Sequence, residues 1–73
     1  MSSSETPIVL YATHGGRTFK IEEDATAGFY LYAFEGARCT HDHLQDTLAL
    51  AKECAREEFG VPEDAWHDAT PAA

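Results

Sequence analysis

Residues 29–34, Phe-Tyr-Leu-Tyr-Ala-Phe, carry apolar or aromatic side chains on both of the faces that a β-strand presents. Aromatic and β-branched residues favour strands, and successive side chains of a strand point to opposite faces of its sheet. A strand that is apolar on both sides is typical of the interior of a sheet. Any fold of this chain must therefore either cover both faces of this run or leave one of them exposed.

Two further runs predict neighbouring strands. Residues 8–13 are rich in β-branched and aromatic side chains, and residues 18–23 alternate apolar and polar side chains. Gly15 and Gly16 lie between the two runs, and both can adopt the positive φ angles of a two-residue hairpin. A further turn is expected at residues 35–38, so the three strands predict an antiparallel sheet.

A helix is predicted to begin at Asp42, because Asp42 and Gln45 have the spacing of a capping box. It is expected to end at Gly60, which suits the left-handed residue after a helix, and Pro62 cannot continue it. A short helical turn is expected after Pro62, with Trp66 covering an edge of the core. At about 100° per residue, the apolar side chains between the two caps form one stripe, made of Leu44, Leu48, Ala51, Ala55 and Phe59.

These elements predict an α+β fold in the order β-β-β-α. It is a three-stranded antiparallel sheet with one long C-terminal amphipathic helix on one face and a short helical turn after it. We expect a single domain at residues 8–66, with disordered segments at residues 1–7 and 67–73. A chain of 73 residues is too short for two ordinary domains, and its core is thin.

One helix covers only one face of such a sheet. If Phe19 and Ile21 face the helix, an aromatic cluster lies on the second face, and we predict that it binds a partner. The predicted partner-binding residues are Tyr11, Tyr30, Tyr32 and Phe34. Two alternatives stay open: Trp66 and the chain ends wrap this face, or the rings stand on a solvated sheet. A homodimer with its sheets packed face to face needs only one self-complementary patch.

The sequence has 13 acidic residues against 5 Lys and Arg, a formal net charge of −8. This charge argues against nucleic acid and anionic membranes as partners, and no apolar run approaches the roughly 18 residues of a membrane span. Between Asp42 and Asp68 there are eight acidic residues against Lys52 and Arg56. This excess either keeps the domain dissolved or steers it toward a basic partner.

The first residues have neither the basic nor the apolar segment of a secretory signal, so we expect a cytoplasmic protein. Reduced thiols are then expected at Cys39 and Cys54, although a disulfide between them stays open.

The residues Cys39, His41 and His43 alternate, so in an extended segment they would share a side and could bind a metal ion. A structural zinc site takes four ligands at other spacings, so we predict a buried Cys39, solvated histidines and no metal site, with metal binding as the alternative. A nucleophilic cysteine needs a histidine base, a third orienting group and a cleft, and a sheet with one helix offers little concavity. We therefore predict no enzymatic activity, no catalytic residues and no cofactor.

The chain resembles a group of small uncharacterised bacterial proteins, for which no activity is implied. It shares with them Gly28-Phe29-Tyr30-Leu31-Tyr32, Leu44-Gln45-Asp46-Thr47-Leu48, and Phe59-Gly60-Val61-Pro62 followed by Trp66. More loosely, it resembles the HicB antitoxin domain in Gly28-Phe29-Tyr30, Cys39 and Asp46-Thr47-Leu48. It lacks the Pro-rich segment that precedes the cysteine in that family. This second resemblance implies a partial ribonuclease-H-like β-β-β-α fold without catalysis.

The sequence therefore predicts a small, acidic, non-enzymatic protein-binding module, of the kind that acts as an antitoxin- or immunity-like inhibitor of a basic partner. The alternatives are a homodimeric structural protein and a metal-binding module that uses Cys39, His41 and His43.

Overall fold

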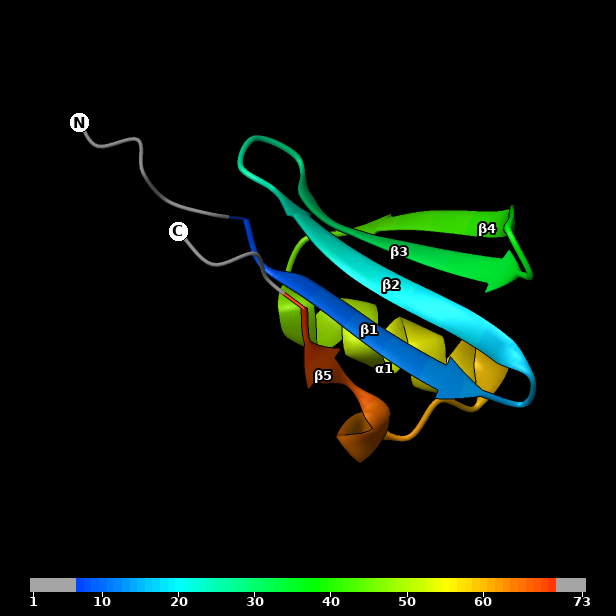
Figure 1. Ribbon diagram of the computed structural model, residues 1–73. Coiled ribbons are helices and arrows are strands. Elements are labelled where there is room, and N and C mark those ends of the chain that lie inside the picture. Colours follow the sequence, from blue (N-terminus) through cyan, green and yellow to red (C-terminus); the bar gives the residue numbers. More distant parts are fainter. Residues whose placement is uncertain (1–6, 70–73) are drawn as a thin grey trace.

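The computed structural model describes residues 7–69 of the chain (Figure 1). Within this stretch the elements are β1 (Val9–His14), β2 (Arg17–Asp24), β3 (Gly28–Glu35), β4 (Arg38–Gln45), α1 (Leu48–Phe59), the 3₁₀ turn η1 (Glu63–Ala65) and β5 (His67–Asp68). The first four strands form an antiparallel meander, and β5 pairs with the outer side of β1, so the strand order is β4-β3-β2-β1-β5. Figure 1 shows α1 behind this sheet, on one of its two sides.

The predicted α+β class is confirmed, with an antiparallel sheet and one helix in the described part of the chain. The predicted number of strands is wrong, because the sheet formed by residues 7–69 has five strands rather than three. The helix also lies in the middle of the chain, because η1 and β5 follow it. The two additional strands flank the predicted three, one at each edge of the sheet.

The first additional strand, β4, occupies residues where we predicted a turn and the start of the helix. Asp42, the predicted N-cap, lies opposite Tyr32 in the β3–β4 ladder, and Gln45 lies opposite Phe29. Leu44 is 49% exposed instead of belonging to the apolar stripe of the helix. An N-cap contributes about 1 kcal/mol, whereas pairing with β3 satisfies a whole row of backbone groups on an apolar strand. The longer set of hydrogen bonds outweighs the local capping signal.

The helix therefore begins later than predicted, at Leu48. Thr47 is the N-cap, and its Oγ1 accepts a hydrogen bond from the backbone N–H of Leu50 at 3.1 Å. The C-terminal end is as predicted. Gly60 has a φ of 75°, and its N–H points to the carbonyl oxygens of Ala55 and Arg56.

The core lies between α1 and the sheet face that the helix covers. Its buried members are Leu10, Ala12, Phe19, Ile21, Leu31, Ala33, Ala51, Ala55 and Val61. The predicted inward positions of Phe19 and Ile21 are thereby confirmed, and Leu31 and Ala33 of β3 lie on the same side. Trp66 is half-buried against this core, and the rings of Phe19 and Phe59 lie 5.1 Å apart. The two buried residues of α1 are alanines, whose small side chains allow the helix backbone to pack close to the sheet.

The second additional strand, β5, lies in a segment that composition placed in a disordered tail. His67 and Asp68 pair with Tyr11 and Leu10, and the N–H of Ala69 donates to the carbonyl of Val9 at 2.8 Å. This pairing protects the outer edge of β1, which would otherwise present unpaired backbone groups. The rest of the two predicted tails, residues 1–6 and 70–73, lies outside the described residues, and Pro7 is exposed.

Candidate functional site

The sheet side opposite α1, here called the open face, is built from alternate residues of four strands. The strand register places most of these residues in two rows across the sheet, and Phe34 lies in a third row with Thr13, Thr18 and Cys39. The first row is Tyr11, Lys20, Tyr32 and Asp42, and the second is Val9, Glu22, Tyr30 and Leu44. Most of their neighbours along β1, β2 and β3 point to the helix side and are buried in the core, whereas the neighbours along β4 and the residues of the two rows are half-buried or exposed.

Three rings follow one another along β3 on the open face, and we call them the aromatic row. The ring centroids of Tyr30 and Tyr32 lie 5.9 Å apart at an interplanar angle of 19°, and those of Tyr32 and Phe34 lie 6.3 Å apart at 39°. These separations suit favourable ring–ring contacts. All three side chains are half-buried. The aromatic row is therefore an ordered, partly accessible apolar surface.

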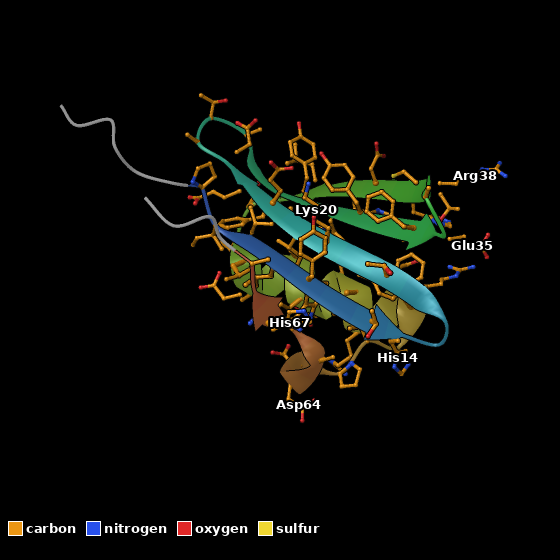
Figure 2. The ribbon with its side chains drawn as sticks, in the orientation of Figure 1. His14, Lys20, Glu35, Arg38, Asp64 and His67 are labelled. Carbon is orange, nitrogen blue, oxygen red and sulfur yellow. The ribbon has the colours of Figure 1, made fainter. Side chains whose placement is uncertain are left out.

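Lys20 on β2 lies beside the aromatic row and separates it from Tyr11 on β1. Its Nζ lies 5.9 Å from the centroid of the Tyr32 ring and 3.3 Å from Oε1 of Glu22. Figure 2 shows Lys20 near the middle of the sheet, on the side turned away from α1, with ring side chains around it. The structure thus brings three of the four predicted partner-binding residues together and places Tyr11 on the same face, across Lys20.

The environment of Tyr32 changes its acidity. Partial burial raises the pKa of the Tyr32 hydroxyl above the ordinary value of 10.0, the negative charge of Glu22 and the phenol of Tyr30 add to this, and Lys20 opposes it. The hydroxyl is therefore protonated at physiological pH, and it can both donate and accept a hydrogen bond. It is a polar group at the centre of the aromatic row.

Trp66 was one candidate cover for the open face, and the structure places it elsewhere. Its ring packs against the helix-side core, and its Nε1 is buried without a hydrogen-bond partner among residues 7–69. The other candidate cover, the chain ends, falls mainly on residues 1–6 and 70–73, outside the described part.

Cys39, His41 and His43 do not gather, although the segment is extended as the metal-binding alternative requires. The ladder between β3 and β4 shifts register between Ala33 and Phe34. The shift places Cys39 opposite Phe34 on the open face, and His41 opposite the buried Ala33 on the helix side. Among the described residues, no three His, Cys, Asp or Glu side chains are grouped so as to hold a metal ion. Both cysteines are free thiols.

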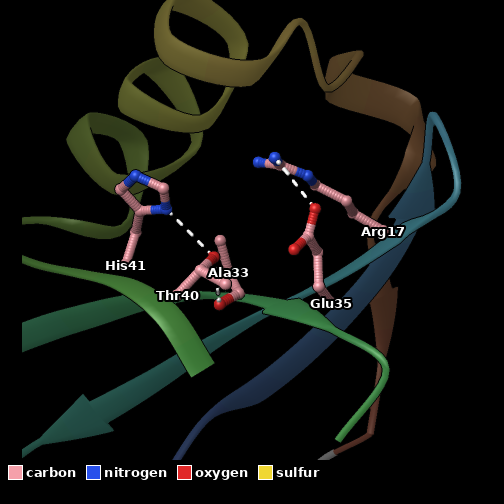
Figure 3. Close-up of polar contacts among 5 residues, drawn as sticks. All are labelled: Arg17, Ala33, Glu35, Thr40 and His41. Atoms are coloured by element: carbon pink, nitrogen blue, oxygen red, sulfur yellow. Dashed lines mark hydrogen bonds and ion pairs between the residues drawn. The ribbon is translucent and has the colours of Figure 1, made fainter. Parts of the chain in front are cut away.

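The two histidines belong instead to a cluster at the end of α1. Their rings stack at 6.4 Å, and the ring of His41 meets Phe59 edge-on at 5.3 Å. Arg17 lies over the ring of Phe59, with its Cζ 5.8 Å from the ring centroid. Its Nη2 lies 3.4 Å from Oε2 of Glu35. Figure 3 shows His41 directed toward the helix, with its Nδ1 joined to the Thr40 hydroxyl at 3.0 Å. These contacts close one end of the core.

Sequence reasoning missed the contribution of β4 to the open face. Asp42 and Leu44 complete its two rows, but the sequence assigned both residues to the helix. Their strand has no apolar–polar alternation, so hydrophobic periodicity gave no signal.

No family model, curated protein or solved structure matches this chain. Within residues 7–69, no helix has the length and apolar character needed to cross a membrane.

Proposed function

We propose that this chain is a non-enzymatic protein-binding module that docks a basic protein on its open face. The observation that carries the proposal is the aromatic row of Tyr30, Tyr32 and Phe34. Its rings are ordered by contact with each other, yet they are left half-exposed on the side of the sheet that α1 does not cover. Aromatic side chains of this kind are enriched in the centres of protein interfaces.

The basic character of the partner follows from charge. The sequence carries a net charge of −8, and within the two rows the carboxylates of Glu22 and Asp42 outnumber the ammonium of Lys20. The acidic residues of α1 lie on the opposite side of the sheet, so they act on a partner through their long-range field rather than by contact. Such a field accelerates encounter with a basic surface and weakens with salt. An inhibitor of the antitoxin or immunity type would work in this way, by covering a basic surface of its target.

The test is affinity capture with three forms of the chain, followed by reconstitution with the purified partner. Tyr32→Ser removes the central ring of the aromatic row, and Ala49→Ser is the matched control, because Ala49 is exposed on α1. We expect a basic protein to bind the native chain and the control equally, and to bind Tyr32→Ser at least about tenfold more weakly. Its association rate should fall as salt rises.

Equal binding by all three forms, or capture of nothing, contradicts the proposal. Self-association is the second candidate function, because a face with stacked rings can also cover its own copy. Sedimentation equilibrium at micromolar concentration tests this second candidate. If the native chain forms a dimer and Tyr32→Ser does not, the open face binds a second copy of this chain and not a basic partner.

A further inference from the structure

The outer edge of β4 is open on its regular half. β4 lies at one end of the strand order, and in the described part of the chain it has a strand neighbour on one side only (Figure 1). The register irregularity is confined to the part near Cys39, and residues 41–45 pair regularly with β3. In a strand at the edge of an antiparallel sheet, alternate residues direct their N–H and C=O groups away from the sheet. Such an edge is a template for one more strand.

A groove runs beside this edge, between β4 and α1. It measures about 330 Å³ and is open to solvent. Two residues of β4 form one wall, and one stripe of α1 forms the other. The lining residues are His43, Gln45, Leu50, Glu53, Cys54, Glu57 and Glu58. A strand added to β4 would place every second side chain in this groove and the others beside Leu44, which is 49% exposed on the open face.

The charge of the groove selects its occupant. Three of its lining residues are carboxylates on α1, and neither Lys nor Arg is among the described residues that line it. Burial raises the pKa of the Cys54 thiol, and the charges of Glu58 and Glu57 raise it further, which agrees with the count of carboxylates in the groove. Lys or Arg side chains of an added strand would lie next to these carboxylates.

A second copy of this chain is a poor occupant of the same edge. Pairing of two β4 strands about a two-fold axis would bring the two acidic grooves side by side on one face of a continuous sheet. Like charges would then be held close together. The edge is therefore better matched to a basic strand than to itself.

From these observations we infer that the β4 edge and the adjoining groove bind an extended basic segment of a protein partner by strand addition. The segment pairs with residues 41–45, directs alternate Lys or Arg side chains at Glu53, Glu57 and Glu58, and lays its apolar side chains beside Leu44. This site adjoins the open face at Leu44, but its backbone pairing and its carboxylates do not involve the rings of the aromatic row.

The test titrates the isotope-labelled full chain with a capped ten-residue peptide of alternating Lys and Val, followed by NMR. We expect the shifted amides to cluster at residues 41–45 and along the groove side of α1. Two matched peptides define the mode. In one, Glu replaces Lys, and it should not bind. In the other, methyl groups on alternate backbone nitrogens block one edge, and it should bind at least about tenfold more weakly, because two or more hydrogen bonds are lost.

Matched variants of the protein separate local from general attraction. Glu53→Gln/Glu57→Gln removes two carboxylates from the groove, whereas Glu63→Gln/Asp64→Asn removes two from η1, where Figure 2 shows Asp64 at a distance from the β4 edge. The groove variant should weaken binding about three- to tenfold, and the η1 variant should weaken it less than about twofold in physiological salt.

Equal weakening by the two variants, undiminished binding of the methylated peptide, or shifts centred on Tyr11 and the aromatic row would overturn the inference. So would concentration-dependent shifts at residues 41–45 in the protein alone, because they would identify a second copy as the occupant. Tyr32→Ser should leave peptide binding unchanged, so this test and that of the aromatic row can fail independently.

Discussion

Gly28 lies against the backbone carbonyl of Gln45, so closely that a Cβ at position 28 would overlap the carbonyl oxygen. Gly28 begins β3 with a φ of 126°, a conformation that side chains rarely adopt. The contact joins the start of β3 to the end of β4, the strand that the sequence did not predict. The absence of a side chain at Gly28 is therefore part of what allows β4 to reach its full length.

The first prediction concerns this contact. Gly28→Ala should lower the free energy of unfolding by about 2 kcal/mol or more, because strained backbone and steric overlap add. Gly36→Ala is the matched control, since Gly36 has a φ of 61° and open space around its Cβ position. It should cost only the backbone term of about 1–2 kcal/mol. Chemical denaturation measures both, and a smaller effect at Gly28 than at Gly36 would contradict the close contact.

The second prediction locates the helix start. Thr47→Ala removes the hydroxyl that accepts from the N–H of Leu50 and should cost about 1 kcal/mol of stability, while Thr47→Ser should restore most of it. Asp42→Ala should change stability by less than about 0.5 kcal/mol, because Asp42 is exposed on a strand. If the larger loss came from Asp42, the helix would begin where the capping box placed it.

The third prediction concerns the close approach of α1 to the sheet. Ala51 is fully buried, so Ala51→Leu has no space for its added carbons and should destabilise the protein by about 1–3 kcal/mol. Ala49→Leu makes the same change on the exposed side of α1 and should lie within about 0.5 kcal/mol of the native chain. Thermal unfolding of the two variants distinguishes them, and equal midpoints would show that the assigned helix face is wrong.

The fourth prediction follows from the raised pKa of Tyr32. The folded chain holds the proton more tightly than the unfolded chain, so the unfolded state loses it first as pH rises. The contribution of this group to stability is fully present below about pH 10 and is lost as pH rises through the folded-state pKa. Denaturation at pH 9 and pH 11 should show this loss in the native chain and a smaller one in Tyr32→Phe. The same slope in both proteins would assign the effect to other groups.

The fifth prediction uses the raised pKa of Cys54. A thiol alkylates through its thiolate, so burial and the neighbouring charges of Glu58 and Glu57 should make Cys54 react slowly. With Cys39→Ser as the background, Glu57→Gln/Glu58→Gln should accelerate the reaction of Cys54 with iodoacetamide at pH 7.5. Iodoacetamide is uncharged, so the carboxylates change the reaction rate through the thiol and not by attracting or repelling the reagent. An unchanged rate would mean that the carboxylates do not influence the thiol.

Elements with strong local signals were predicted from the sequence at nearly their observed positions. The Gly15-Gly16 hairpin has both glycines at positive φ, 61° and 79°, and joins His14 to Arg17. The capped end at Gly60 and the inward positions of the predicted strands depend on only a few neighbouring residues each. Short-range chemistry of this kind is readable from one sequence, because the deciding atoms are close along the chain.

The candidate site was predicted in part for the same reason. Successive side chains of a strand point to opposite faces, so the sequence of residues 29–34 showed that Tyr30, Tyr32 and Phe34 share one face. This is the open face because the other face packs against the helix. The neighbours of those rings were not predicted. Lys20 beside Tyr32, and Asp42 and Leu44 at the end of each row, depend on strand register and on a strand that the sequence did not indicate.

The sequence alone determined the α+β class, the inward and outward sides of the central strands, and the end of the helix. Only the tertiary structure decided that residues 38–45 pair with β3 instead of opening the helix, and that residues 67–68 pair with β1. The physical reason is that both segments have weak intrinsic preferences, so their conformation is set by the unpaired backbone edges that the stronger strands present. Those edges do not exist until the sheet has formed.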